Sequence, residues 1–269
     1  MSGFSVTWLD LREGADFAAR DKTLAARALQ WMSAYADAIP LIVDLGSGTG
    51  STLRALTALG AEDCAKNLVW RLVDHDPALL NEALRRHGKT HVIEDYEADL
   101  LAIDSLPLTG ARLVSASALF DLVSRNVVDK LAARLAQQGT ALYAALNYDG
   151  CTQWNPPHPL DSDVLEAFNK DQRRDKGLGM ALGTDSGSYL KAAFEKQGYE
   201  VQMADSPWTL GTENRAMVEA LIDGIASAVA TGYGLNPEAL HHWKQFRLQN
   251  AATGTCIVGH NDILALPLS

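Results

Sequence analysis

The sequence predicts one doubly wound α/β domain, in which helices cover both faces of a mainly parallel β-sheet. Short apolar runs alternate with amphipathic stretches of helical period along the first half of the chain. A glycine-rich turn at 46–50 joins the first apolar run to the helical stretch after it. Units of strand, helix and strand close by right-handed crossovers, so successive strands pair in parallel. With 269 residues, 47% of them hydrophobic, the chain can form one large core, and we expect a single domain over 1–269.

The expected elements follow one another in a regular order. Apolar residues at helical spacing over 23–36 predict a helix, within an N-terminal helical extension over 1–38 that stops before Pro40. Pro77 and Gly139 mark the beginning of one later helix and the end of another. Strands are expected over 41–45, 68–73, 90–93, 113–117, 140–147, 199–204 and 255–259. Further helices are expected over 51–59, 77–87, 120–138, 188–197, 213–231 and 237–249.

The regular pattern breaks between the fifth and sixth expected strands. The segment 149–187 is rich in Gly, Pro, Asp and Asn, and only 163–171 has the spacing of a short helix. A segment of this length with so little regular structure is normally functional or disordered. We therefore interpret 149–187 as an insertion in the fold.

Composition and charge exclude several classes of function. The formal net charge is -10, from 33 acidic and 23 basic residues, and the basic residues are scattered, so we expect no nucleic-acid partner. Cys64, Cys151 and Cys256 are far apart and lack metal-ligand spacing, which argues against a disulfide framework and a metal site. No segment reaches the roughly 18 apolar residues of a membrane span. We expect a cytoplasmic protein without a membrane partner, and the sequence leaves its oligomeric state open.

The glycine-rich turn is the strongest functional signal. It reads Asp44-Leu-Gly-Ser-Gly-Thr-Gly50 and stands at the carboxyl end of the first strand, where an open α/β sheet binds its ligand. Glycines permit a tight turn and let a ligand lie against the main chain, while the next helix offers unpaired N–H groups. The dinucleotide fingerprint is G-x-G-x-x-G, whereas this turn is G-x-G-x-G with an acid two residues before its first glycine. The pattern favours a nucleoside cofactor other than NAD.

In motif order, residues 41–147 resemble the class I S-adenosylmethionine-dependent methyltransferases, which share a Rossmann-like seven-stranded sheet, and the turn resembles motif I of that family. The resemblance implies S-adenosylmethionine as cofactor. It implies that Asp44 helps to hold the amino group of the cofactor and that the turn surrounds its methionine and ribose portions. The residues expected to bind the cofactor are Arg20, Asp44, Gly46, Ser47, Gly48, Gly50, Asp74, His75, Asp99, Leu100, Ser115 and Ser117.

The resemblance also implies the roles of the two acids that follow the second and third strands. An acid after the second strand grips the ribose hydroxyls, and one carboxylate can accept from two vicinal hydroxyls. Asp74 stands at this position, but the extra residues 61–67 leave the choice between Asp74 and Asp76 open. Asp99 stands where the family contacts the adenine amino group. The neighbouring His75 is expected to pack against the cofactor.

Two further expectations concern the methionine part of the cofactor. Ser115 and Ser117 end the fourth expected strand, which the resemblance places beside the methyl-bearing sulfur. Arg20 precedes the turn, and related enzymes use a basic residue there for the cofactor carboxylate. A guanidinium binds a carboxylate through two parallel hydrogen bonds, which makes Arg20 the candidate.

On the acceptor side, insertions after strands four and five form the substrate wall in the family, so Asn169 and Lys176 are candidate substrate contacts. Tyr148, Asp149 and His158 are candidate general bases if the acceptor is a hydroxyl or an acidic carbon, whereas a neutral amine requires none.

His158 also ends Asn-Pro-Pro-His, which resembles the catalytic tetrapeptide of amino-methylating enzymes that act on adenine or glutamine. That tetrapeptide follows strand four in those enzymes and strand five here, so we interpret it as a stiff extended stretch.

The predicted function is methyl transfer from S-adenosylmethionine to an unidentified small-molecule acceptor. Two alternatives stay open. One is an NAD(P)-dependent oxidoreductase of related fold, which the glycine spacing disfavours. The other is a protein that binds the cofactor without turnover, because pocket glycines also serve folding.

Overall fold

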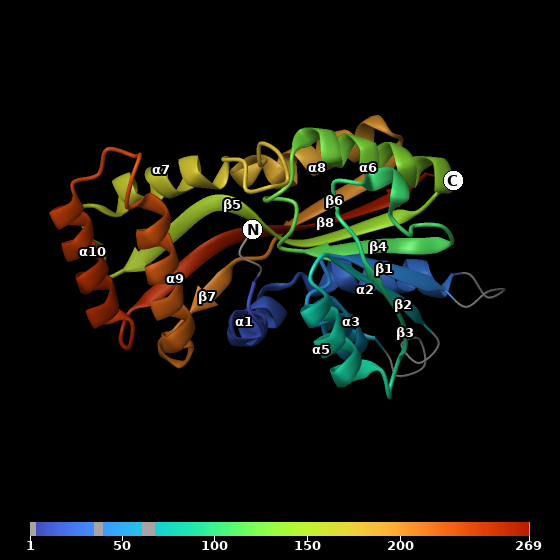
Figure 1. Ribbon diagram of the computed structural model, residues 1–269, viewed down its shortest axis with the longest axis horizontal. Helices are drawn as coiled ribbons and strands as arrows, with labels where there is room; N and C mark the ends of the chain where they lie inside the picture. Colours follow the sequence, from blue (N-terminus) through green and yellow to red (C-terminus); the bar gives the residue numbers. More distant parts are fainter. Residues whose placement is uncertain (1–3, 35–39, 61–67, 269) are drawn as a thin grey trace.

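A computed structural model describes residues 4–34, 40–60 and 68–268 of the chain (Figure 1). Within these residues, eight strands form one sheet in the order β3-β2-β1-β4-β5-β8-β6, with β7 paired to β8. The strands are β1 (Leu41–Leu45), β2 (Val69–Asp74), β3 (Val92–Glu97), β4 (Ala111–Ser117), β5 (Ala141–Asn155), β6 (Tyr199–Asp205), β7 (Trp208–Leu210) and β8 (Thr255–Pro267). The predicted α/β fold is confirmed, and the short strand β7 adds to the seven strands predicted.

The strand order creates a crevice at the place where a ligand is expected. Strands β1 to β5 pair in parallel, whereas β8 is antiparallel to β5, β6 and β7. The chain passes from β1 to β2 on one side and later returns to β4 on the other side of β1. This reversal is the topological switch point of a doubly wound sheet, and ligands bind outside the carboxyl ends of the strands there.

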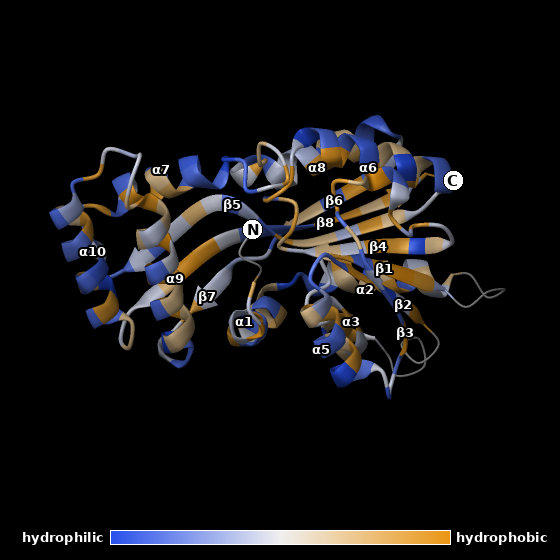
Figure 2. Ribbon diagram, viewed as in Figure 1, coloured by the Kyte–Doolittle hydropathy of each residue, from blue (hydrophilic) through white to orange (hydrophobic). Residues whose placement is uncertain are grey.

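Helices cover both faces of the parallel sheet (Figure 1). The helices of the described residues are α1 (Val6–Ala19), α2 (Lys22–Ser33), α3 (Ser51–Leu59), α5 (Pro77–His87), α6 (Arg125–Gln138), α7 (Asp161–Gln172), α8 (Ser186–Lys196), α9 (Arg215–Val229) and α10 (Pro237–Asn250). Helices α2, α3 and α5 bury their apolar sides against one face of the sheet, where Trp70 and Tyr143 are fully buried. Helices α6 and α8 cover the other face. Figure 2 shows the hydrophobic residues concentrated on strands such as β1 and β4.

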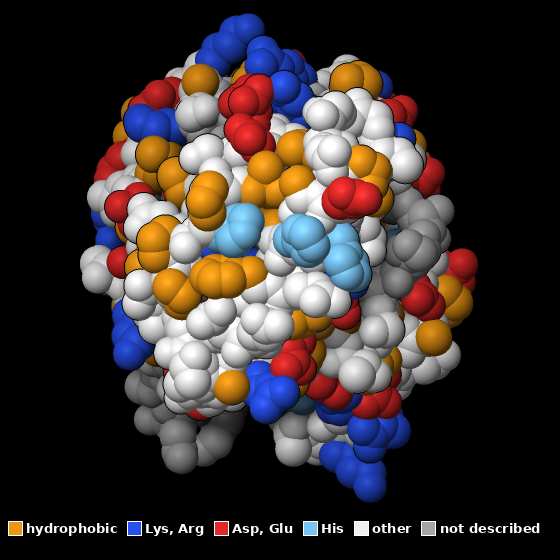
Figure 3. Space-filling view, turned by 90° about the vertical axis from the view of Figure 1, so that its left-hand side faces the viewer, with side chains coloured by type: hydrophobic (Ala, Val, Ile, Leu, Met, Phe, Trp, Pro, Cys, Tyr) orange, Lys and Arg blue, Asp and Glu red, His pale blue; other side chains and the backbone are white. Residues whose placement is uncertain are grey.

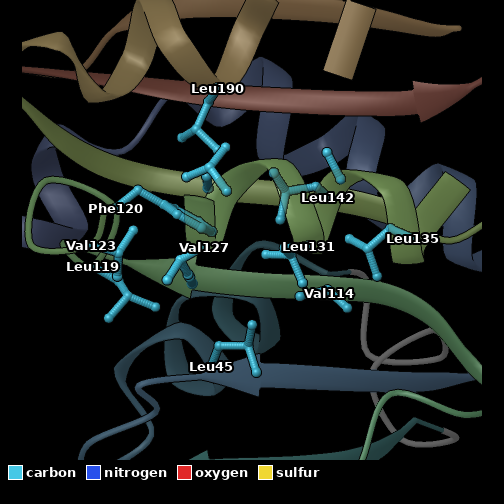
Figure 4. Close-up of a cluster of buried hydrophobic side chains, with 14 of the residues drawn as sticks. Leu45, Val114, Leu119, Phe120, Val123, Val127, Leu131, Leu135, Leu142 and Leu190 are labelled. Carbon is cyan, nitrogen blue, oxygen red and sulfur yellow. The ribbon is translucent and has the colours of Figure 1, made fainter. Parts of the chain in front are cut away.

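In the core under α6 and α8, apolar residues at helical spacing on α6 pack against apolar residues of the sheet. Leu131 and Leu135 of α6 point toward Val114 of β4 and Leu142 of β5 (Figure 4). Each of these four side chains is at most 1% exposed, so the apolar spacing of the helix matches the apolar face of the sheet. Gly139 ends α6 at φ 62°, a left-handed conformation that favours glycine.

A second group of elements covers the outer parts of β5 and β8, and we call residues 148–172 and 208–258 the accessory layer. In Figure 1 it occupies the left-hand part of the molecule, where α7, α9 and α10 pack around the extended strands. Leu210, Ile222 and Trp243 are fully buried in its core. Figure 3 views this end of the molecule and shows acidic and basic side chains interspersed, with histidines among hydrophobic side chains.

The accessory layer corrects the interpretation of 149–187 as a largely irregular insertion. Residues 149–155 continue β5, and α7 spans 161–172, longer than the short helix predicted. The strand was missed because exposed and part-buried residues alternate along 151–155, so the segment lacks a continuous apolar run. The last strand was likewise predicted too short, because β8 continues to Pro267.

Other predicted boundaries also shift. Helix α6 begins at Arg125, not at 120, because the chain first forms bends and turns over 118–124, after the end of β4. Strand β3 is displaced to Val92–Glu97 and lies at the edge of the sheet, where its charged residues are tolerated. The N-terminal extension contains two helices, α1 and α2. No helix of the described residues is long and apolar enough to cross a membrane.

Charged side chains attach helix α1 to helices α3 and α5, which cover one face of the parallel strands. Asp10 forms an ion pair with Arg86 of α5 at 2.7 Å, and Glu13 pairs with Arg54 of α3. Arg54 also donates to the carbonyl of Thr49 at 2.6 Å. These contacts hold α1 across the carboxyl end of β1.

We expect Trp243→Ala to lower the free energy of unfolding by about 3–5 kcal/mol, because the indole is fully buried and its removal leaves a cavity. Its Nε1 also donates to Asp161 at 2.8 Å. Urea denaturation measures the change, and Met203→Ala, at a side chain 47% exposed, serves as control. A loss below about 1 kcal/mol would show that the accessory layer does not pack on the extended strands as described.

Candidate functional site

A cavity of ≈ 330 Å³ lies at the carboxyl ends of β1, β2 and β4. The glycine-rich turn forms one wall and α1 forms another. Eight of the residues predicted to bind the cofactor line it: Gly46, Ser47, Gly48, Asp74, His75, Asp99, Leu100 and Ser117. The structure therefore brings together side chains from four separate stretches of the sequence.

Three glycines shape the turn. Gly46, Gly48 and Gly50 have φ of 61°, 53° and 84°, a region that L side chains rarely adopt. A Cβ on Gly48 would lie 3.1 Å from Leu9 of α1, and one on Gly50 would lie 3.2 Å from His87. The turn therefore lies close to its neighbours, and a Cβ at Gly48 or Gly50 fits only if the neighbouring side chain moves.

The Asp74 carboxylate connects the second strand to this turn. Its Oδ2 accepts from the Gly48 N–H at 2.8 Å, and its Oδ1 accepts from the Asp76 N–H at 3.0 Å. The Asp76 carboxylate accepts from Ala78 N–H at 2.9 Å and caps α5, outside the cavity lining. Of the two acids that the sequence left open, Asp74 is the one in the cavity wall.

Asp44 and Ser115 lie directly behind the turn. Ser115 Oγ donates to Asp44 Oδ1 at 2.6 Å, and both residues are buried. Burial raises the pKa of Asp44 to about 6, against the opposing effects of the Ser115 hydrogen bond and the nearby Arg20 charge. Asp44 Oδ2 accepts no hydrogen bond of normal length and angle among the described residues, although the Thr52 hydroxyl is close enough to lower the pKa of Asp44.

Two further polar atoms near the turn are buried without a partner in the described part of the chain. Arg20 is 3% exposed, and its Nη2 donates to Ser117 Oγ at 2.9 Å, but its Nη1 is unpaired. Ser47 Oγ is likewise unpaired. Buried polar atoms are nearly always hydrogen-bonded, so these three atoms near the turn have unused hydrogen-bonding capacity.

The far end of the cavity combines an acid with apolar side chains. Asp99 follows β3, and its Oδ1 accepts from the Leu101 N–H at 2.9 Å. Leu79 and Leu100 line the wall beside it. His75 also lines the cavity, with its Nδ1 3.3 Å from Asp74 Oδ1.

The predicted acceptor-side residues lie outside this lining. Tyr148 OH donates to Asn169 Oδ1 at 2.9 Å, and Asn169 donates to the carbonyl of Gly150 at 2.8 Å. Asp149 Oδ1 accepts from the Cys151 N–H at 2.7 Å. β5 continues as a strand through Tyr148 and Asp149, and their side chains bond to Asn169 of α7 and to the backbone of Cys151.

His158 and Lys176 are not among the residues that line the cavity, although Gly177 and Leu178, which directly follow Lys176, are. The His158 ring lies 5.0 Å from that of Phe246 on α10, and Lys176 Nζ donates to Gln172 Oε1 at 2.9 Å. No three His, Cys, Asp or Glu residues form a possible metal site in the ranges that the structure describes.

Sequence reasoning missed a polar group that α1 contributes to the cavity. Arg12 and Asp16 line it, and Arg12 Nε donates to Asp16 Oδ2 at 2.8 Å. Trp208 of β7 donates to Asp16 Oδ1 at 2.9 Å. The four-residue spacing of Arg12 and Asp16 was a usable signal, but 1–38 was assigned only as a helical extension.

No protein-family model and no curated protein matches the chain, whereas many solved structures do. A protein of Anaeromyxobacter dehalogenans assigned as a type II methyltransferase is 16% identical, with a TM-score of 0.51, over 93% of this chain and 98% of its own. A Bacillus halodurans protein assigned as a methyltransferase is 13% identical, with a TM-score of 0.50, over 90% and 100%. These likenesses confirm the Rossmann-like methyltransferase fold.

A Haemonchus contortus phosphoethanolamine methyltransferase, solved with S-adenosylhomocysteine, has a TM-score of 0.46 at 13% identity. The match covers 91% of this chain but only 53% of that one, so this chain spans about half the length of that protein.

We expect Gly48→Ala to weaken the binding of S-adenosylhomocysteine about tenfold or more, because the new Cβ forces Leu9 or the turn to move. Gly139→Ala is the matched control, since Gly139 has a similar φ of 62° and nothing within 4 Å of an added Cβ. Both variants should lose about 1–2 kcal/mol of stability from the left-handed backbone. Calorimetric titration that finds equal affinity in both variants would contradict the assignment of the turn.

Proposed function

We propose that the protein is an S-adenosylmethionine-dependent methyltransferase that acts on a small-molecule acceptor. The observation that carries the proposal is the pair of unpaired, oppositely charged atoms behind the glycine turn, Arg20 Nη1 and Asp44 Oδ2. An amino-acid cofactor supplies a carboxylate for the guanidinium and an ammonium for the carboxylate. The methionine part of S-adenosylmethionine carries both groups, which can pair with these two buried atoms.

The remaining lining fits the adenosyl part of the same molecule. Asp74 uses one lone pair of each oxygen on backbone N–H groups, and a carboxylate has about four such sites, so it can still accept from ribose hydroxyls. Asp99 can accept from the adenine amino group, between the apolar side chains of Leu79 and Leu100. His75, which is beside Asp74, adds a ring to the ribose side.

The bound cofactor supplies an activated methyl group on a sulfonium. The chain has to orient the acceptor and exclude water. Leu119, Leu122 and Leu178 line the cavity near Ser117 and give that part an apolar wall. Because Tyr148 and Asp149 bond elsewhere, we assign neither of them a proton-accepting role in this proposal. We likewise assign no catalytic role to His158. The proposal includes no substrate contact by Asn169 or Lys176.

The direct test is calorimetric titration of the folded protein with S-adenosylhomocysteine and, separately, with NADH. We expect binding of the first with a Kd in the micromolar range or tighter, and no binding of NADH. Labelled S-adenosylmethionine then tests transfer to a panel of amines, phenols and carboxylic acids.

The outcome separates the alternatives. Binding of NADH alone would favour the oxidoreductase. Cofactor binding without transfer to any acceptor of a broad panel would favour a binding protein. Absence of heat with both ligands would overturn the proposal.

We expect cofactor affinity to depend on pH through Asp44. Because its pKa is raised to about 6, the carboxyl is mostly protonated below that pH and loses its attraction for the ammonium group. Affinity is therefore full at pH 7 and falls as pH decreases through 6, by about tenfold at pH 5. Titrations of S-adenosylhomocysteine between pH 5 and 8 measure this dependence.

The matched variant is Asp44→Asn, which keeps the shape of the side chain and removes its titration. It should bind the ligand weakly and with a flat profile over the same range. A wild-type profile as flat as that of the variant would argue against contact between Asp44 and the ligand.

A further inference from the structure

We propose that the acceptor carries a carboxylate or a phosphate group, which binds to Arg12. The inference rests on the proposed function and names the chemical class of its acceptor. It follows from a buried guanidinium whose position is fixed and whose outer nitrogens are unused.

Two contacts hold Arg12, one with Asp16 and one with Trp208. It is 8% exposed, its Nε donates to Asp16 Oδ2, and its Cζ lies 5.2 Å from the centre of the Trp208 ring. Asp16 is itself oriented by the Trp208 Nε1 donor at 2.9 Å. The guanidinium is therefore preorganised before any ligand arrives, which reduces the entropy lost on binding.

The two terminal nitrogens of Arg12 have no hydrogen-bond partner among the described residues. Neither nitrogen is sealed from solvent, and Arg12 lines the cavity. A paired N–H fork that opens on a cavity matches two oxygens of a carboxylate or phosphate.

Arg12 is distinct from the residues assigned to the cofactor. Arg20, whose Nη1 is unpaired behind the turn, is available for the cofactor carboxylate. Among the described lining residues, Arg12 is the one lysine or arginine. It lies at the junction of α1 with β7 in the accessory layer, whereas Asp74 and Asp99 lie at the ends of β2 and β3.

The cavity around Arg12 has an apolar part in addition to the acids Asp16, Asp74 and Asp99. Leu119, Leu122 and Leu178 line the same cavity, and a charge pair in an apolar environment is screened less than in water. The Arg12 charge also affects two other ionisable groups: it lowers the pKa of His260 and opposes the rise in the pKa of Asp121, whose Oδ1 is buried and unpaired among the described residues. Burial, the largest effect, raises the pKa of Asp121, against the opposing charges of Arg12 and Lys176.

The test uses three probes of similar shape with protein saturated by S-adenosylhomocysteine: benzoate, phenyl phosphate and neutral benzamide. We expect at least one of the two anions to bind about tenfold tighter than benzamide in calorimetric titration. In Arg12→Gln this preference should fall to within about twofold, while the Kd of S-adenosylhomocysteine stays within about threefold of wild type. Arg12→Lys, which retains the charge but not the fork, should keep part of the preference.

Controls separate the inference from other effects. Arg215→Gln removes the same charge from an exposed side chain of α9 and should leave the affinities for S-adenosylhomocysteine and the three probes unchanged. If Arg12→Gln does not fold, Arg12→Lys carries the comparison, and an undiminished preference in it overturns the inference.

Equal binding of the three probes to the wild type, binding of none, or a preference that survives in Arg12→Gln also overturns the inference. A loss of S-adenosylhomocysteine affinity of more than about tenfold in Arg12→Gln overturns it as well, by assigning Arg12 to the cofactor. The same three probes are titrated against protein without S-adenosylhomocysteine. If the wild type binds no S-adenosylhomocysteine but prefers the anions in that titration, the proposed function fails and the anion site stands.

Discussion

The hydrogen bond from the Gly48 N–H to the Asp74 carboxylate is the contact on which the site depends. Together with the bond from Ser47 N–H to the Val73 carbonyl at 3.1 Å, it ties the turn after β1 to the end of β2. The left-handed glycines make this close approach possible, and the approach in turn places Asp74 in the cavity wall. One short contact therefore shapes the turn and positions an acid for a ligand.

The parallel strands, their helices and the glycine turn could be predicted because the sequence patterns that indicate them each span a short stretch of the chain. The apolar run at 41–45, the helical spacing after it and the glycine pattern lie within twenty residues, and backbone requirements act directly on residue type. The role of Asp74 rather than Asp76 was not readable from the sequence, because both acids stand at the end of β2. Their difference appears only in which backbone N–H groups each one accepts.

The acceptor side resisted prediction for a different reason. The second half of β5 carries polar residues on an exposed face, so its pattern resembles that of a loop, and Tyr148 and Asp149 were placed near the ligand on that basis. The partner strand β8 lies more than a hundred residues later in the chain, and a single sequence does not show such pairing. Arg12 was missed because its importance depends on Trp208, which approaches it only in the folded chain.

The attachment of α1 has a consequence for how the cavity wall responds to salt. The helix forms one wall of the cavity, yet its ion pairs to α3 and α5 involve side chains that are 19–44% exposed. Mobile ions screen such pairs over a Debye length of about 8 Å at physiological ionic strength, while apolar packing beneath the sheet is little affected. Salt therefore weakens these two ion pairs of the α1 wall more than it weakens the apolar contacts that Trp8, Leu11 and Ala15 make.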